Sequence, residues 1–171
     1  MVTLFSGPNV PVPFDNGADE HQDVQTVNFP ASAVPVVGDT YQFQVLFSDG
    51  STQTLSASVT GVLTNSIPTS LVMNPSPSAT DPTLTWGAPA TPPASYTYSV
   101  GVYDPHGSLN WNYSGGNNSN GIPSTQLSVL YNVDGSSSST TLAGATQYNW
   151  YVQVQDANRN TAQVTTTYTT P

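Results

Sequence analysis

Residues 142–156 read LAGATQYNWYVQVQD, and large apolar side chains alternate with amides along most of this stretch. Tyr148, Trp150, Val152 and Val154 fall on one side of an extended chain, and Gln147, Asn149, Gln153 and Gln155 fall on the other. A period of two is typical of a β-strand with one buried face. The pattern therefore predicts that Tyr148 and Trp150 enter a core, and that Tyr151 projects among the amides.

The composition extends this prediction to the whole chain. Hydrophobic residues make up 36% of the 171 residues and charged residues only 6%, so Ser, Thr, Asn and Gln supply most of the polarity. These residues, together with abundant Val and Tyr, favour strands and turns over helices. No long stretch shows the 3.6-residue period of an amphipathic helix. We therefore expect an all-β protein.

The first half of the chain contains its own strand pattern. Tyr41, Phe43, Val45 and Phe47 alternate with polar residues, and Leu55, Ala57 and Val59 alternate on a returning segment. Asp49-Gly50 lies between them, and Asp-Gly is a strong hairpin signal because a type I′ turn needs positive φ at both central positions. A further short strand is expected at residues 24–30, VQTVNFP.

The second half repeats this design, and a proline-rich segment precedes it. Pro75, Pro77 and Pro82 lie within residues 66–86, and proline cannot donate to the ladder of a central strand. We place a domain boundary near Ser76, which gives a small Ig-like domain at residues 1–75 and a second domain at residues 76–171. Short strands separated by turns predict two tandem antiparallel β-sandwiches. Strands are expected around the core Trp86 and around three alternating sets: Tyr96, Tyr98, Val100 and Val102; Leu127, Val129, Tyr131 and Val133; Ala162, Val164 and Tyr168.

The charge of the chain excludes several kinds of partner. Arg159 is the single Lys or Arg residue, and the formal net charge is −9. Binding to nucleic acid or to an anionic membrane surface needs a cluster of cations, which this chain cannot assemble. No segment has the length of a membrane span, so no membrane insertion is expected. Cysteine is absent, which excludes disulfides and thiolate chemistry. The start, MVTLFSGPN, lacks the features of a signal peptide, so an exported form would be a mature chain or a fragment.

Residues 78–171 resemble fibronectin type III domains. The spacing Leu142-x-Gly144-x-Thr146-x-Tyr148 is similar to the Leu-x-Pro-x-Thr-x-Tyr run that forms the tyrosine corner of that family, with Gly144 in place of proline. The run PTLTWGAP, residues 82–89, looks like the second strand of the family, and residues 134–141, DGSSSSTT, form an insertion before Leu142. Residues 38–62, and the closing QDANRNTA at residues 155–162, resemble bacterial Ig-like domains. These resemblances imply spacers, adhesion elements or appended domains of exported proteins.

The chain offers few candidate catalytic or metal-binding residues. His21 and His106 lie in polar loops, no nucleophile or metalloprotease motif is present, and no catalytic residue or cofactor is expected. One acidic segment offers oxygen ligands that calcium prefers: Asp15, Asp19, Glu20 and Asp23. The alternative is an exposed acidic loop, since the spacing matches no EF-hand. Asp156, Asn158 and Asn160 form a second oxygen cluster, which an Asx-turn explains.

The strongest candidate for a contact surface is the run GSLNWNYSGGNNSNG, residues 107–121. Trp111 and Tyr113 alternate with asparagines there, and aromatic rings beside amides suit carbohydrate stacking or a protein interface. The alternative is that Trp111 covers one open end of the sandwich.

Two functions remain open at this stage. The first is a non-enzymatic structural or adhesive module, a spacer or a filament subunit, in a secreted or cell-surface assembly, whose partners are other protein domains or identical subunits. The second is a carbohydrate-binding accessory of a secreted hydrolase that reads sugar with Trp111 and Tyr113.

Overall fold

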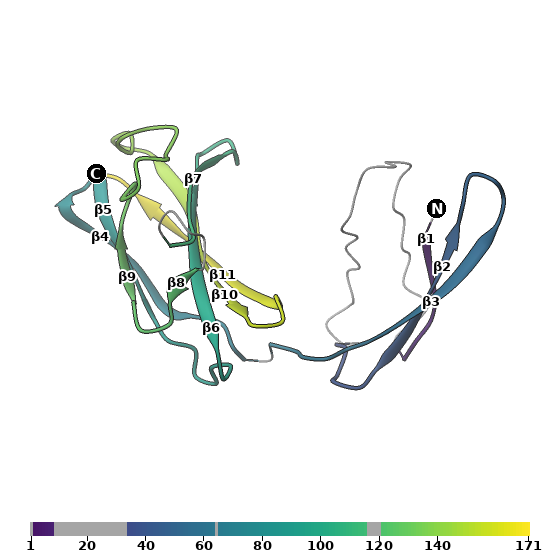
Figure 1. Cartoon of the computed structure of the whole chain (residues 1–171). Helices are drawn as coiled ribbons and strands as arrows, with labels where there is room; N and C mark the ends of the chain where they lie inside the picture. Colours follow the sequence, from purple (N-terminus) through teal and green to yellow (C-terminus); the bar gives the residue numbers. More distant parts are fainter. Residues whose placement is uncertain (1, 9–33, 64, 116–120) are drawn as a thin grey trace. The chain divides into compact units, whose positions relative to one another are not determined.

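The computed structural model describes residues 2–8, 34–63, 65–115 and 121–171, and the described residues contain strands and no helix (Figure 1). All strand pairs are antiparallel. The prediction of an all-β chain built from antiparallel sheets is confirmed. The chain divides into two compact units, Met1–Val62 and Leu63–Pro171.

The described residues of the N-terminal unit form one three-stranded sheet in the order β1-β2-β3. Its strands are β1 (Val2–Ser6), β2 (Thr40–Leu46) and β3 (Thr52–Ser58). Phe43 lies opposite Leu55, and Tyr41 lies opposite Ala57, so the alternating apolar residues share one face of the sheet. The short strand expected at residues 24–30 lies outside the described residues.

The turn between β2 and β3 differs in type from the prediction. Of its residues only Gly50 has a positive φ, at 83°, so the turn is not type I′. Gly50 N–H donates to Phe47 O at 3.0 Å, and Phe47 N–H donates to Ser51 O at 2.9 Å. This is a type I turn followed by a glycine bulge, a hairpin loop that needs one left-handed residue instead of two.

The C-terminal unit is a sandwich of two antiparallel sheets. One sheet has the order β4-β5-β9, and the other has the order β11-β10-β6-β7, with β8 also paired to β6. The strands are β4 (Thr69–Ser78), β5 (Asp81–Gly87), β6 (Tyr96–Tyr103), β7 (Leu109–Tyr113), β8 (Ile122–Pro123), β9 (Ser128–Leu130), β10 (Gln147–Asp156) and β11 (Thr161–Thr169).

The core of this unit fills the space between the two sheets. Trp86 on β5 packs edge-to-face on Tyr98 of β6, with ring centroids 5.3 Å apart. Trp150 is fully buried, and Tyr148 is 5% exposed. The opening stretch therefore forms β10, whose apolar side is core as the alternation predicted. The other members of the core include Met73, Leu84, Val100, Val102, Trp111, Val129, Tyr131, Leu142, Val152 and Val154.

The tyrosine corner expected from the resemblance is present. The backbone N–H of Ala143 donates to the Tyr148 hydroxyl at 2.9 Å. Ala145, within the same corner, adopts a positive φ of 50°, and its N–H donates to Pro171 O at 3.0 Å. Gly144 thus replaces the family's proline without loss of the corner, because these hydrogen bonds fix the chain there.

The boundary between the units differs from the one expected near Ser76. It falls between Val62 and Leu63, and most of the supposed linker is strand β4. Pro75 and Pro77 are tolerated because β4 lies at the edge of its sheet and its register shifts between Asn74 and Pro77. Met73 on this strand is 6% exposed and belongs to the core. Proline therefore marks an edge strand here, and the sandwich begins earlier than predicted.

Candidate functional site

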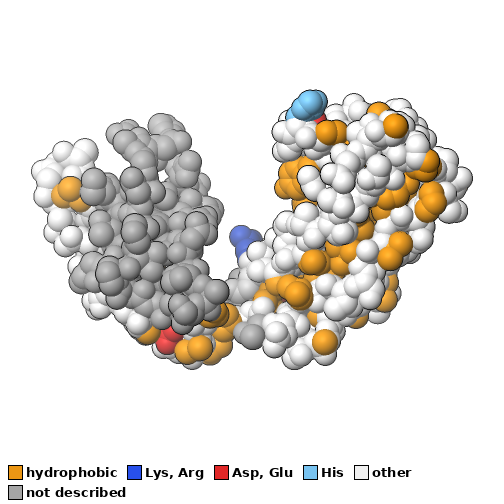
Figure 2. Space-filling view, turned by 180° about the vertical axis from the view of Figure 1, so that it is seen from behind, with side chains coloured by type: hydrophobic (Ala, Val, Ile, Leu, Met, Phe, Trp, Pro, Cys, Tyr) orange, Lys and Arg blue, Asp and Glu red, His pale blue; other side chains and the backbone are white. Residues whose placement is uncertain are grey.

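The outer face of the sheet β11-β10-β6-β7 carries mostly uncharged polar side chains on β6 and β10. Side chains alternate between the two faces of strands β6 and β10. Tyr98, Val100 and Val152 point into the core, and the residues between them, which include Thr97, Ser99 and Gln153, point outward. Register aligns these outward residues across the strands, with Gln153 opposite Ser99 and Gln155 opposite Thr97. Figure 2 shows that charged side chains are sparse on the visible face of the described residues. The sheet thus presents hydroxyls and carboxamides in rows.

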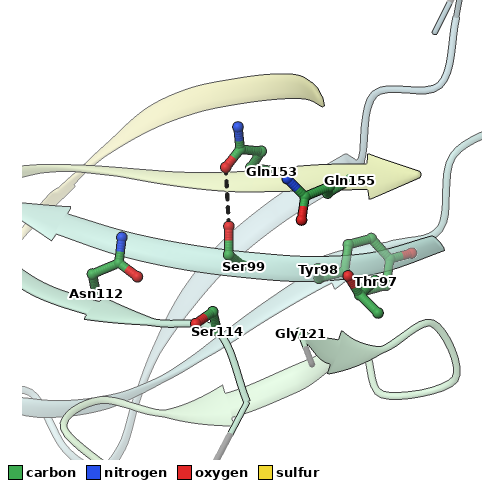
Figure 3. A pocket seen from close by; sticks show the side chains of 8 residues that line it. All are labelled: Thr97, Tyr98, Ser99, Asn112, Ser114, Gly121, Gln153 and Gln155. Carbon is green, nitrogen blue, oxygen red and sulfur yellow. Dashed lines mark hydrogen bonds between the residues drawn. The ribbon is translucent and has the colours of Figure 1, made fainter. Parts of the chain in front are cut away.

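A hollow of about 230 Å³ opens among these residues (Figure 3). Ser99 Oγ donates to Gln153 Oε1 at 3.1 Å across β6 and β10, and this bond fixes the orientation of the amide. Among the described residues, no hydrogen bond engages the Gln153 NH₂ group, so it can donate to a bound molecule. The lining residues are Thr97, Tyr98, Ser99, Asn112, Ser114, Gly121, Gln153 and Gln155.

A second hollow, of about 260 Å³, adjoins the first at Thr97 and Gln155. It is lined in part by Arg159, the single Lys or Arg of the chain, on the turn between β10 and β11. Asp156 also lines it, but both oxygens of this carboxylate accept hydrogen bonds within the turn, from Asn158 N–H, Asn160 N–H and Asn160 Nδ2 at 2.8–2.9 Å. The predicted Asx-turn at Asp156 is confirmed, and it explains this oxygen cluster without a metal.

Tyr151 lies on the outer face, as predicted, but it is only 5% exposed. Its ring covers Gly101 on the neighbouring strand: a Cβ atom at Gly101 would stand 2.2 Å from Tyr151 Cε1. Asn112 Nδ2 donates to the Tyr151 hydroxyl at 2.7 Å, and the Tyr103 ring lies 5.7 Å away between centroids. Burial raises the pKa of Tyr151, and the nearby Tyr103 hydroxyl raises it further. The ring is thus a fixed, neutral part of the sheet surface.

The side chains that line the first hollow determine which groups it can bind. None of the eight residues that line the first hollow is Asp, Glu, His, Lys or Arg. Aliphatic hydroxyls and carboxamides neither donate nor abstract protons near neutral pH, and burial raises the pKa of the Tyr98 phenol above its usual value. They form hydrogen bonds with uncharged polar groups, such as the backbone or side chains of another protein or the hydroxyls of a sugar. The arrangement is suited to binding.

The contact surface predicted at Trp111 is wrong. Trp111 is 1% exposed, and Tyr131 packs on its ring edge-to-face at 5.3 Å. Its indole Nε1 donates to Asp134 Oδ1 at 2.9 Å, and the Tyr113 ring stacks on it at 5.8 Å. Trp111 lies opposite Val102, which faces the core, so the pattern of β7 places it inside. No ring face of Trp111 is open to a sugar, and the alternative prediction, a ring that closes the sandwich, describes it better.

The insertion at residues 134–141 explains why Trp111 is buried. Ser138 N–H donates to Asn110 O at 2.9 Å, and Asn110 Nδ2 donates to the Tyr131 hydroxyl at 2.8 Å. The Tyr131 hydroxyl in turn donates to Ser139 O at 2.9 Å. The serine-rich segment is therefore held against β7 through a partly buried polar network. Sequence alone marked it as an insertion but gave no sign of this network.

The remaining candidate site residues are the acidic residues of the N-terminal segment and the two histidines. Asp15, Asp19, Glu20, Asp23 and His21 lie outside the described residues. His106 is exposed in the turn after β6, where its backbone N–H donates to Asp104 Oδ1 at 2.9 Å. Within the described part of the chain, no three His, Cys, Asp or Glu side chains come close enough to hold a metal ion. The same residues include no apolar helix long enough to span a membrane.

For the outward residues of β6 and β10, the sequence predicted only that polar side chains alternate with apolar ones along each strand. Gln153 and Gln155 were assigned to the polar face correctly, but nothing indicated that Ser99 and Asn112 would join them. Strand pairing between residues far apart in the sequence creates the hollow, and pairing is not readable from one strand.

The two sheets packed around one core, together with the tyrosine corner, define the C-terminal unit as an immunoglobulin-like, fibronectin type III-like β-sandwich. No protein-family model and no curated protein matches the sequence. Among solved structures, the chain is similar to domains d3-d4 of the rat CD45 extracellular region, with a TM-score of 0.41 and 12% identity. That match covers 95% of this chain and 80% of the CD45 chain.

Proposed function

We propose that this protein is a non-enzymatic structural or adhesive module of a secreted or cell-surface assembly. The observation that carries the proposal is the outer face of the sheet β11-β10-β6-β7, where hydroxyls and carboxamides from paired strands line a hollow that contains no Asp, Glu, His, Lys or Arg. Such a surface binds by many uncharged hydrogen bonds. Surfaces of Tyr, Ser and Asn recognise proteins in this way, because they offer adaptable hydrogen bonds beside rigid rings.

The partners that fit this surface are other protein domains or identical subunits. The acidic chain, with a net charge of −9, would repel a second acidic surface at long range, so the contact must form where charge is sparse. The first hollow satisfies this condition. The low charge of the sandwich also makes contacts there insensitive to salt.

Sedimentation velocity over a wide concentration range, combined with a glycan array, tests the proposal. We expect concentration-dependent assembly or binding to a protein partner of the same assembly, and no glycan binding. Hydrolysis or transfer of a substrate by the purified chain, lost when a residue of the hollow is substituted, would contradict the non-enzymatic assignment.

A second function is carbohydrate binding in the same hollow, instead of at Trp111. Gln153, held by Ser99, and the exposed Asn112 amide are groups that bind sugar hydroxyls in a fixed orientation. Gln153→Ala should abolish glycan binding if it occurs. Gln163→Ala is the matched control, because Gln163 is an exposed glutamine of β11 that does not line the hollow.

A further inference from the structure

The edges of the two sheets in the sandwich differ in how well they resist pairing with another strand. An exposed edge is a template for strand addition unless proline, charge, a bulge or shortness blocks it. β4 carries Pro75 and Pro77 and two register shifts. β9 is three residues long, and β7 is five residues long with a register shift opposite Val102 and Tyr103. Each of these three edges is protected.

The fourth edge, β11, has none of these protections. It runs for nine residues, TAQVTTTYT, and pairs with β10 without a register shift from Thr161 to Thr169. It contains no proline and no charged residue, although the chain carries ten carboxylate side chains. Threonine and valine favour the extended conformation. β11 is therefore a long, regular and uncharged edge strand.

Hydrogen bonds at both ends of the hairpin show which backbone groups of β11 face outward. Asp156 N–H donates to Asn160 O, and Thr170 N–H donates to Thr146 O, both at 3.0 Å. In an antiparallel pair, alternate residues bond to the partner strand. The even-numbered residues thus bond to β10. The odd-numbered residues present N–H and C=O groups to the open side, and they are Thr161, Gln163, Thr165, Thr167 and Thr169.

We propose that β11 pairs with β11 of a second copy, antiparallel and centred on Thr165, so that the two larger sheets become one continuous sheet. This inference rests on the proposed function of a structural module. It names a second copy of the same chain as the partner. The centre at Thr165 is the register in which all five outward residues find partners: Thr165 pairs with itself, Gln163 with Thr167, and Thr161 with Thr169.

The side chains of β11 are self-complementary in this register. All five odd-numbered side chains are exposed on the outer face, where threonine would lie beside threonine and glutamine beside threonine. Cross-strand pairs of hydroxyls and amides stabilise a sheet, and like charges directly opposite destabilise it. In a chain of net charge −9, an uncharged strand lets two copies pair with no carboxylates directly opposite one another.

Single cysteines test the register, because the chain has no cysteine of its own. At the centre, Thr165 would face its own counterpart at a Cα distance of about 5.5 Å, within the range of a disulfide. We expect Thr165→Cys to form a covalent dimer under mild oxidation. The matched control is Thr161→Cys, whose counterpart would lie about 27 Å away along the strands, eight residues at about 3.4 Å each. Equal cross-linking of the two variants, or none in Thr165→Cys, would overturn the proposal.

Charge exchange at the same position tests the two-fold symmetry. Thr165→Lys and Thr165→Glu should each be monomeric in sedimentation velocity, because like charges meet at the centre, and an equal mixture should recover the dimer. Ser128→Lys, which places the same charge on the exposed edge strand β9, should dimerise like the parent. Melting curves check that each variant is folded.

The outcomes separate this proposal from the proposed function. A parent chain that stays monomeric, or a Thr165→Lys variant that still dimerises, would overturn pairing through β11 and leave the structural-module function standing. Enzymatic activity in the first hollow would overturn the proposed function without affecting the dimer.

Discussion

The Tyr148 hydroxyl accepts a 2.9 Å hydrogen bond from the backbone N–H of Ala143, five residues upstream. This bond ties the start of β10 to the segment that crosses from one sheet to the other. Tyr148 is 5% exposed, and the hydrogen bond lies in a partly buried position. The Tyr148 hydroxyl therefore stabilises the connection between β9 and β10.

Tyr148→Phe should destabilise the C-terminal unit by about 1–3 kcal/mol, because the Ala143 N–H loses its acceptor in a partly buried site. The ring remains, so packing changes little. Urea unfolding of the two proteins measures the difference. Tyr103→Phe is the control, since the Tyr103 hydroxyl has no hydrogen-bond partner among the described residues, and it should cost less. Equal effects of the two substitutions would show that the corner contributes nothing particular.

Gly101→Ala should destabilise the same unit by about 1–3 kcal/mol, because the added methyl group meets the Tyr151 ring on the outer face. The same substitution at Gly144 is a suitable control, since a Cβ there meets only Pro171 O, at 3.4 Å. Replacing Tyr151 by serine in the Gly101→Ala background should recover part of the loss. A double-mutant cycle by thermal unfolding gives the coupling, and additive effects would mean that ring and glycine do not interact.

The sequence predicted the C-terminal sandwich well because its strands obey a period of two. Tyr148, Trp150 and Trp86 face the core, and the tyrosine corner forms, because both features depend on residues close together in the chain. The turn at Asp156 was predicted for the same reason. Local alternation and local hydrogen bonds are readable from one sequence.

Features that depend on distant pairing were not predictable. β4 was mistaken for a linker because its prolines match a linker, and only its pairing with β5 shows that it is an edge strand. The flanking asparagines made Trp111 a candidate for a contact surface, with a ring that covers one open end of the sandwich as the alternative. Its burial depends on Asp134 and Tyr131, some twenty residues further along the chain. Nothing in the local pattern of β7 indicates these partners.

Asp134 should make the unit sensitive to acid. Burial alone would raise the pKa of Asp134, but hydrogen bonds from Trp111 Nε1 and Ser136 outweigh it and lower the pKa. A lowered pKa in the folded state stabilises the protein above the unfolded pKa, about pH 4, and this contribution disappears as the pH falls through the folded pKa. Asp134→Asn should therefore be less stable than the parent at pH 7, with a difference that shrinks below about pH 4.

Thermal unfolding from pH 7 to pH 2 measures this difference. Trp111→Phe removes the indole donor, so Asp134→Asn should lose part of its pH-dependent effect in that background. A stability difference between Asp134→Asn and the parent that stays constant across the acid range would rule out the lowered pKa as its cause.

The last prediction concerns where the C-terminal unit begins. The structure places the division before Leu63, so a fragment of residues 63–171 should fold and unfold cooperatively by itself.

A fragment of residues 76–171, cut at the boundary that the prolines suggested, lacks the core residue Met73 and most of β4. Removing a buried methionine side chain alone costs about 2–5 kcal/mol. The missing segment, residues 63–75, also removes the bond from Thr85 Oγ1 to Val72 O, of 3.1 Å, and the bond from Ser66 Oγ to Thr91 O, of 2.8 Å. The shorter fragment should therefore be unfolded or far less stable in urea unfolding. If the two fragments unfold at the same urea concentration, β4 is dispensable and the unit begins near Ser76 after all.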